Sequence, residues 1–203
     1  MRAHPHFNPF NIFGEIETPD WSKIFPNKNP LVLEIGFSNA RWLIPYAKAN
    51  PDLNVVGLEV RKKFVDKVKE TIKKEELPNA YVLLANANTA LEKLFKPESI
   101  STTLILFPDP WYKDRHLKRR VINPKFLPIL HKAMQKDGIL HIATDQEQLA
   151  KDMREIINSS DLFGNLFDKN NWAPENISGF FSDIELYHIQ HGHPIFRLQY
   201  KRK

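Results

Sequence analysis

The sequence predicts an α/β protein in which a mostly parallel sheet carries helices on both faces and ends in an antiparallel hairpin. Short apolar runs alternate with longer segments of helical spacing between residues 31 and 158. This alternation is typical of consecutive βαβ units, which form parallel sheets. Near the C-terminus, two segments of alternating polarity flank a turn that contains glycine and proline, which indicates an antiparallel pair of strands.

Each expected strand is a compact apolar run, and most are followed by an expected helix. The strands cover 31–35, 55–60, 80–85, 102–107 and 139–143. The helices cover 40–49, 61–77, 89–95, 124–136 and 145–158. Asn123 is expected to cap the helix whose first position is Pro124. Residues 161–179 show no clean period, and the hairpin is expected at 184–189 and 195–200.

The composition is that of one globular domain with an acidic partner. An N-terminal extension, 1–30, is expected to pack on a main domain, 31–203. The net charge of +5 and the pI near 9.3 favour an acidic partner. The absence of cysteine excludes disulfides, thiolate metal sites and a cysteine nucleophile. Without a membrane-length apolar run or a signal-peptide core, a cytoplasmic protein, monomer or homodimer, is expected.

The most informative segment is 107–120, which follows the expected fourth strand. Asp109 stands between two prolines that stiffen the backbone, and Trp111 and Tyr112 follow as an aromatic platform. Open α/β sheets bind ligands at the carboxyl ends of their strands, where this segment begins. The combination suits a nucleobase attached to phosphates, although a proline-rich turn before a solvated basic helix remains the alternative. Five cations complete it: Lys113, Arg115, Lys118, Arg119 and Arg120.

Two further strand ends predict a nucleotide-like cofactor. Gly36 permits a close backbone approach after the first strand, but a single glycine disfavours the dinucleotide fingerprint of NAD. Glu34 is an unusual residue for a buried strand and needs a partner. Glu59 ends the second strand, where an acid accepts ribose hydroxyls, and Asn86 ends the third. Together these residues fit S-adenosylmethionine better than NAD or ATP, because nothing resembles a phosphate-binding loop.

These residues carry a resemblance to a known family. The sequence resembles the tRNA (guanine-N7)-methyltransferases, which modify the variable loop of tRNA, over about residues 31 to 200. The most specific match is Phe107-Pro-Asp-Pro-Trp-Tyr-Lys113 with the Arg-His-Leu-Lys-Arg-Arg120 that follows it. Shorter matches are Leu33-Glu-Ile-Gly36, Gly57-Leu-Glu-Val60, Asn86-Ala87, Thr144-Asp145 and Gly192-His-Pro-Ile195.

The resemblance implies a Rossmann-like class I methyltransferase with a seven-stranded sheet, and it implies roles for individual residues. The methyl donor S-adenosylmethionine would contact Glu34, Gly36, Glu59, Asn86, Ala87 and Asp109, the last being the catalytic acid. The tRNA or its target guanine would contact Lys113, Asp145 and a C-terminal tetrapeptide with Ser182 and Glu185. The other cations of segment 107–120 (Arg115, Lys118, Arg119 and Arg120) are expected from their charge to bind RNA phosphates. Three positions depart from the family: Ser38 and Ala40 replace glycines, and Asp183 replaces a lysine.

The expected chemistry asks for positioning rather than proton transfer. Guanine N7 carries a lone pair and no proton, so Asp109 is expected to orient the purine and offset its charge instead of acting as a base. His191 and His193 are expected to form a turn without binding a metal, and His116 to touch a phosphate. Two alternatives stay open, namely a non-catalytic RNA-binding protein on a degenerate methyltransferase scaffold and a methyltransferase for small molecules or proteins.

Overall fold

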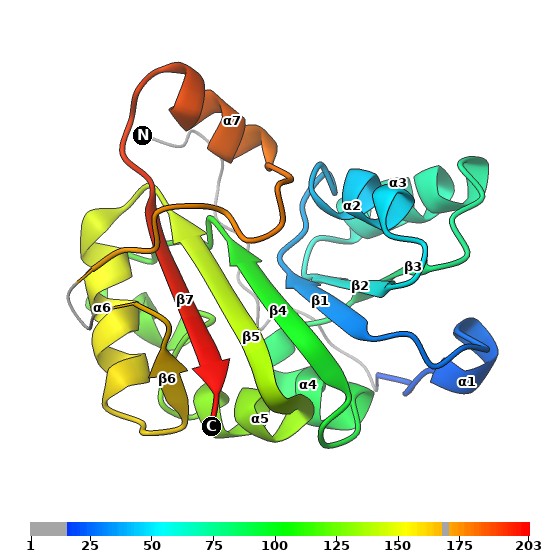
Figure 1. The fold of residues 1–203 in the computed structure, drawn as a ribbon, viewed down its shortest axis with the longest axis horizontal. Helices are drawn as coiled ribbons and strands as arrows, with labels where there is room; N and C mark the ends of the chain where they lie inside the picture. Colours follow the sequence, from blue (N-terminus) through cyan, green and yellow to red (C-terminus); the bar gives the residue numbers. More distant parts are fainter. Residues whose placement is uncertain (1–15, 168–170) are drawn as a thin grey trace.

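The computed structural model describes residues 16–167 and 171–203, and its described strands form one seven-stranded sheet (Figure 1). The strand order is β3-β2-β1-β4-β5-β7-β6. The first five strands are parallel: β1 (Leu31–Ile35), β2 (Asn54–Glu59), β3 (Ala80–Leu84), β4 (Ile100–Leu106) and β5 (Met134–Thr144). β7 (Phe196–Arg202) runs antiparallel between β5 and β6 (Phe163–Asn165). The predicted Rossmann-like, mostly parallel sheet is confirmed.

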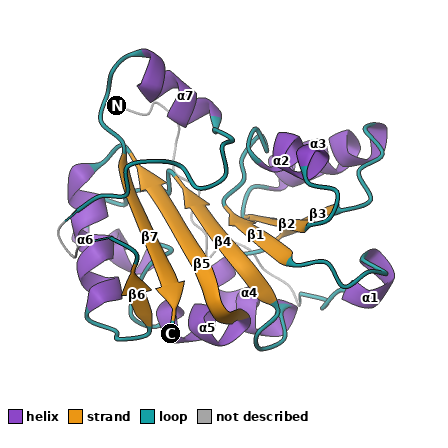
Figure 2. Cartoon of the chain, viewed as in Figure 1, coloured by secondary structure: helices purple, strands orange, loops and turns teal. Residues whose placement is uncertain are grey.

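Helices cover both faces of this sheet (Figure 2). α4 (Ala87–Leu94), α5 (Phe126–Ala133) and α6 (Glu147–Asn158) pack in one apolar cluster. α2 (Leu43–Ala49) and α3 (Lys62–Lys74) pack in the other. The alternation of side chains along β1 explains the division: Leu33 and Ile35 join the first cluster, and Val32 joins the second. A parallel sheet covered on both faces requires the near-continuous apolar runs that the sequence shows.

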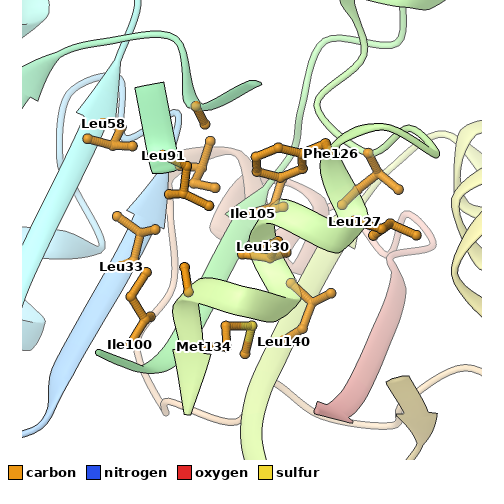
Figure 3. Close-up of a cluster of buried hydrophobic side chains, with 14 of the residues drawn as sticks. Leu33, Leu58, Leu91, Ile100, Ile105, Phe126, Leu127, Leu130, Met134 and Leu140 are labelled. Carbon is orange, nitrogen blue, oxygen red and sulfur yellow. The ribbon is translucent and has the colours of Figure 1, made fainter. Parts of the chain in front are cut away.

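The larger cluster fixes α4 and α5 against the centre of the sheet (Figure 3). Leu91 of α4 and Leu130 of α5 are completely buried against Leu33 and Ile105 of the strands. Each fully buried side chain of this size contributes about 1.5–3 kcal/mol through the hydrophobic effect. This packing holds the carboxyl ends of β1 and β4 in a fixed relation.

The strand predicted at 184–189 is wrong, because these residues belong to the helix α7 (Asp183–Gln190). The Ser182 side chain accepts a hydrogen bond from the backbone N–H of Glu185 and caps the helix. A serine followed three residues later by glutamate is a helix-start signal, which the alternating polarity of 184–189 concealed. β7 pairs antiparallel with β5 and with β6 instead, and β6 lies inside the segment predicted to be irregular.

Other boundaries shift by a few residues. α5 begins at Phe126 with Lys125 in the N-cap position, rather than at Pro124 after an Asn123 cap. Asn123 Oδ1 still accepts from the N–H groups of Lys125 and Phe126, both at 3.1 Å, in the turn that leads into the helix. α5 ends at Ala133 rather than 136, because β5 already begins at Met134. Of the N-terminal extension, residues 1–15 lie outside the described part.

The described part of the extension contacts α4. It contains a short helix, α1 (Trp21–Ile24). The Trp21 ring stacks on Phe95 with a centroid distance of 5.3 Å, and its Nε1 donates to the Leu94 carbonyl at 2.6 Å. These contacts attach the extension to the end of α4, on the main domain.

Candidate active site at the carboxyl ends of the parallel strands

A cleft lies at the carboxyl ends of β1, β2 and β4 and encloses about 770 Å³, part of it open to solvent. Its position is the one expected for ligands of open α/β sheets. The lining residues are Ile35, Gly36, Leu58, Glu59, Val60, Arg61, Ala85, Asn86, Ala87, Asn88, Ile105, Leu106, Phe107, Pro108, Asp109, Trp111, Arg119 and Val121.

The turn after β1 leaves its backbone open to a ligand. Gly36 has φ of +86°, and no atom lies within 4 Å of the position that a Cβ would take. Ser38 and Ala40, which the resemblance places at glycine positions, also adopt positive φ, at 48° and 55°. The left-handed region costs an ordinary residue roughly 1–2 kcal/mol. The turn therefore keeps the glycine conformation without the glycines.

This strain predicts that Ser38→Gly stabilises the fold. Glycine relieves the backbone strain at φ of 48° but loses more entropy on folding, so the free energy of unfolding should rise by about 0.5–1 kcal/mol. Urea unfolding measures the change. Asn39→Gly is the matched control, since the φ of Asn39 lies outside this region, and it should lower the stability by about 0.5–1 kcal/mol. A loss of stability in both variants would contradict the strain at Ser38.

Glu59 ends β2, and its buried carboxylate accepts several hydrogen bonds. Its Oε2 accepts from the N–H of Ser38 at 2.9 Å, and its Oε1 accepts from the N–H groups of Val60 and Arg61 at 2.9 and 3.0 Å. The guanidinium of Arg61 adds bonds to both oxygens, at 3.1 and 3.2 Å. Glu59 therefore connects the turn after β1 to the start of α3. Ligand hydroxyls that bind this carboxylate would replace the Arg61 side chain.

Glu34 is buried one residue before the end of β1 and is not among the residues that line the cleft. Its Oε2 has no hydrogen-bond partner among the described residues. Burial, assisted by the nearby charge of Glu59, raises the pKa of Glu34 from 4.5 to about 8. Contact of Glu34 with the cofactor therefore stays a prediction, and Glu34 does not itself line the cleft.

The raised pKa predicts that Glu34→Gln stabilises the protein at neutral pH. The folded state keeps the Glu34 proton up to about pH 8, whereas the unfolded chain releases it near 4.5. Stability from this group is complete below pH 4.5 and is lost as the pH rises to 8. At about 1.36 kcal/mol per pKa unit, the loss at pH 7 is on the order of 3 kcal/mol.

Urea unfolding of both proteins at pH 5 and pH 7 measures this effect. The advantage of Glu34→Gln should grow with pH, while Glu70→Gln on the exposed face of α3 should show no such trend. An advantage that is equal at both pH values would show that Glu34 is already ionised in the folded protein.

Asn86 and Ala87 open α4 at the cleft. The Asn86 side chain accepts a hydrogen bond from the N–H of Asn88 at 3.0 Å and caps α4. Asn86 is also one of the residues that line the cleft. Asn88 in turn accepts from the Asn123 side chain at 2.6 Å. Asn86, just after β3, is predicted to contact the cofactor. Its position is therefore supported, through Asn88, by a hydrogen bond from Asn123, just before α5.

Segment 107–111 is strained on both sides of its prolines. Phe107 and Trp111 have φ of 51° and 44°, a region that bulky residues rarely adopt. Such strain is held only where the surrounding structure determines it, and it gathers at functional sites. Phe107 is held by burial and by its N–H bond to the Ala143 carbonyl at 2.7 Å. Asp109, exposed between the two prolines, is thereby presented at the cleft.

The aromatic platform predicted after Asp109 is divided between the interior and the surface. The Trp111 ring is buried, with the Arg119 guanidinium 4.9 Å from its centroid and His116 edge-on at 5.5 Å. Tyr112 is 66% exposed, and its hydroxyl donates to the Gln146 side chain at 2.6 Å. Only Tyr112 therefore offers an open ring face.

The basic residues also divide into two groups around the 3-10 helix η2 (Asp114–Arg119). Lys113, Arg115 and Lys118 are exposed. Arg120 serves the fold instead, since its Nη1 donates to Asp152 at 2.7 Å and its Nε to the Pro110 carbonyl at 2.8 Å. Arg120 is predicted to bind RNA phosphates, but its guanidinium is mostly buried and already bonded within the protein. Desolvation, followed by the charges of neighbouring cations, lowers the pKa of His116.

Asp145 follows β5 and lies beside α7. The His188 Nε2 is 3.5 Å from Asp145 Oδ2, which also accepts from the Gln146 side chain at 2.7 Å. Because Gln146 accepts a hydrogen bond from the Tyr112 hydroxyl, these side chains connect segment 107–120 to α7.

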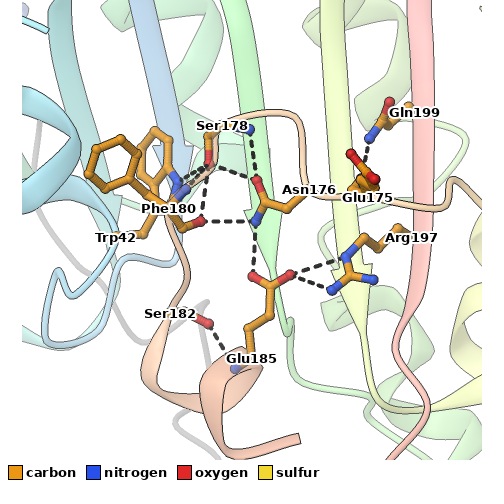
Figure 4. Close-up of polar contacts among 9 residues, drawn as sticks. All are labelled: Trp42, Glu175, Asn176, Ser178, Phe180, Ser182, Glu185, Arg197 and Gln199. Atoms are coloured by element: carbon orange, nitrogen blue, oxygen red, sulfur yellow. Dashed lines mark hydrogen bonds and ion pairs between the residues drawn. The ribbon is translucent and has the colours of Figure 1, made fainter. Parts of the chain in front are cut away.

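Ser182 and Glu185, predicted to contact RNA, are both used within the fold (Figure 4). Ser182 caps α7, and the completely buried Glu185 accepts from Arg197 of β7 at 2.8 and 3.1 Å. Its other oxygen accepts from Asn176 at 3.0 Å. The departure at Asp183 has a partner as well, since its carboxylate lies 3.4 Å from Arg41.

The same network attaches α7 to the turn after β1. Asn176 accepts from the Ser178 hydroxyl at 2.7 Å, and that hydroxyl accepts from Trp42 Nε1 at 2.8 Å (Figure 4). Sequence reasoning missed Arg61, Arg197 and Trp42 as partners of the site. Only Arg61 had a local signal, its spacing of two residues from Glu59.

The comparisons agree with this geometry. Residues 28–198 match the model of a family described as "Putative methyltransferase". The fold is similar to that of the 16S rRNA methyltransferase KamB, with a TM-score of 0.67, 16% identity, and 93% of this chain and 95% of that one covered. It is also similar to an S-adenosylmethionine-dependent methyltransferase from Aquifex aeolicus, with a TM-score of 0.59, 13% identity, and 91% and 90% covered. Fold and family together define an S-adenosylmethionine-dependent methyltransferase.

Sequence relatives specify the family. A tRNA (guanine-N(7)-)-methyltransferase of Colwellia psychrerythraea is 33% identical over 94% of this chain and 77% of its own length. That of Aliivibrio salmonicida is 31% identical over 90% and 77%. The chain belongs to the tRNA (guanine-N7)-methyltransferase family.

Residues 16–167 and 171–203 contain neither a membrane-spanning helix nor a cluster of metal-binding side chains. No helix there is long and apolar enough to cross a membrane. No group of three or more histidine, cysteine or acidic side chains in the same ranges could hold a metal ion.

Proposed function

We propose that this protein transfers a methyl group from S-adenosylmethionine to N7 of a guanine in the variable loop of tRNA. The observation that carries the proposal is the convergence of Gly36, Glu59 and Asp109 on one cleft, in a chain whose relatives are named for this reaction. The proposal implies a cytoplasmic enzyme that acts on tRNA as a monomer or homodimer. The alternative of a non-catalytic scaffold has no specific support.

The cleft has the features that the methyl donor requires. Gly36 leaves space for close approach, and Glu59 offers a buried carboxylate for hydroxyl groups. Leu58 and Ile105 supply apolar walls, which suit an adenine ring. We assign Gly36, Glu59, Asn86 and Ala87 to holding the donor, which supplies an electrophilic methyl group when bound. Glu34 is buried one residue before the end of β1 and does not line the cleft, so it is left out of this assignment.

Asp109 has the position expected of a residue that orients the purine. N7 of guanine has no proton to lose, so no base is required at this atom. A fixed carboxylate can accept hydrogen bonds from the amide and amino edge of guanine and offset the positive charge that develops in the ring. Exposure at the cleft and a backbone fixed by two prolines suit this task. Correct placement of two reactants is itself a large part of catalysis.

Mass spectrometry of nucleosides tests the proposal. Unmodified tRNA incubated with the protein and S-adenosylmethionine should acquire 7-methylguanosine, and a tRNA whose variable-loop guanine is replaced by adenine should not. Methylation of another guanine atom, or of neither tRNA, would contradict the proposed reaction.

A further inference from the structure

The outer surface of α7 and the turn after it carries a cluster of aromatic rings. Tyr187 is 51% exposed, and His191 and His193 are exposed as well. The Tyr187 centroid lies 4.2 Å from that of His191 and 5.8 Å from that of His193, and the two histidine rings are 5.7 Å apart. We call these three residues the ring cluster.

The ring cluster is held in place by its backbone. His191 Nδ1 lies 2.8 Å from the Tyr187 carbonyl oxygen, and the N–H of His193 donates to the His188 carbonyl at 2.9 Å. Gly192 makes the turn between the two histidines with φ of +63°, which glycine adopts without cost. The rings are thus arranged before any partner binds, which reduces the entropy lost on binding.

The ring cluster is continuous with the cleft. His188 stacks on Phe107 with a centroid distance of 5.9 Å and an interplanar angle of 7°, and it lies 5.4 Å from His193. Phe107 lines the cleft beside Asp109. A row of rings therefore leads from the strand end that presents Asp109 to the surface of α7.

The chemistry of this surface and of its surroundings fits an unpaired nucleobase. Aromatic and histidine rings stack on exposed bases in complexes with single-stranded RNA. The exposed cations Lys113, Arg115 and Lys118 belong to the loop connected to Asp145 through Tyr112 and Gln146, and they complement the phosphates of such a strand. A protein partner would gain nothing from this positive charge unless it were acidic.

We propose that Tyr187, His191 and His193 form a stacking surface for an unpaired base of the RNA substrate, next to the base that enters the cleft. The inference rests on the proposed function in that the RNA is a tRNA. Neither Ser182 nor Glu185 takes this role, because both are used inside the fold.

Equilibrium binding of unmodified tRNA at several salt concentrations tests the proposal. Tyr187→Ala should weaken binding by about 5–150-fold, the range measured for the loss of one base stack. The slope of log affinity against log salt should stay that of the wild type, because no phosphate contact is lost. Tyr187→Phe keeps the ring and should bind within a factor of about 2 of the wild type. S-adenosylmethionine affinity and thermal unfolding should be unchanged in both.

Ile189→Ala is the matched control, since Ile189 is an apolar residue of the same helix and is 47% exposed. Its tRNA affinity should equal that of the wild type. Wild-type affinity in Tyr187→Ala, or an equal loss in Ile189→Ala, would overturn the stacking surface. So would a changed sedimentation coefficient of Tyr187→Ala with intact tRNA binding, which would indicate a protein contact. Binding of tRNA without 7-methylguanosine formation would refute only the proposed function, whereas no tRNA binding by the wild type would refute both.

Discussion

Asp109→Ala is expected to lower kcat by about 10²–10³-fold, the range found when one group that stabilises developing charge is removed. The structure presents Asp109 at the cleft on a segment stiffened by Pro108 and Pro110. Asp109→Asn should keep part of the activity, because an amide still accepts a hydrogen bond but carries no charge. Steady-state methylation of tRNA measures both variants. Glu70→Ala, on the exposed face of α3, is the control and should retain full activity.

The pH dependence of the same reaction separates orientation from proton transfer. A residue that only orients guanine gives a kcat without an essential base near neutrality, because N7 loses no proton. A basic limb present in the wild type and absent in Asp109→Asn would instead assign proton transfer to Asp109.

Replacing Lys113, Arg115 and Lys118 by glutamine is expected to reduce the slope of log tRNA affinity against log salt by about 2–3. Each lost phosphate contact removes about 0.7–0.9 from this slope, and these three cations are the exposed ones of the loop. Binding should weaken most at low salt, and S-adenosylmethionine affinity should not change. Filter binding across a salt series measures the slope.

The control for this prediction is a set of equal charge on α3, namely Lys69, Lys73 and Lys74, which are also exposed. Their replacement should leave the slope close to that of the wild type. Arg120→Gln should act differently, by lowering stability, because Arg120 holds Asp152 and the Pro110 carbonyl. An unchanged slope in the loop variant would reassign the loop to a structural role.

The sequence predicts the parallel strands well because their signal is local. β1 and β2 are completely buried, and so are the later parts of β4 and β5, so each of these stretches is a compact apolar run. The prediction for residues 184–189 is wrong because Leu186, Tyr187 and Ile189 are exposed. The apolar residues of α7 therefore do not mark a buried helix face. The capping signal of Ser182 and Glu185 is present in the sequence, but it lies inside the tetrapeptide that resembles that of the family.

The sequence predicts which residues stand at the candidate site but not which other side chains they bind. Gly36, Glu59 and Asp109 stand at strand ends, a position that sequence patterns reveal. The burial of Arg120 depends on Asp152, 32 residues away on α6. The burial of Glu185 likewise depends on Arg197 of β7. Contacts of this kind between distant elements decide which charges are left for a substrate, and no local pattern encodes them.

A tRNA with 7-deazaguanosine at the variable-loop position tests the central claim, methyl transfer to guanine N7, most directly. This nucleoside replaces N7 by carbon and leaves the other edges of the base nearly unchanged. The protein should bind this tRNA with an affinity close to that for unmodified tRNA and should transfer no methyl group to it from S-adenosylmethionine. Transfer of a radiolabelled methyl group to the 7-deazaguanosine tRNA at the rate of the unmodified one would show that another atom is the acceptor.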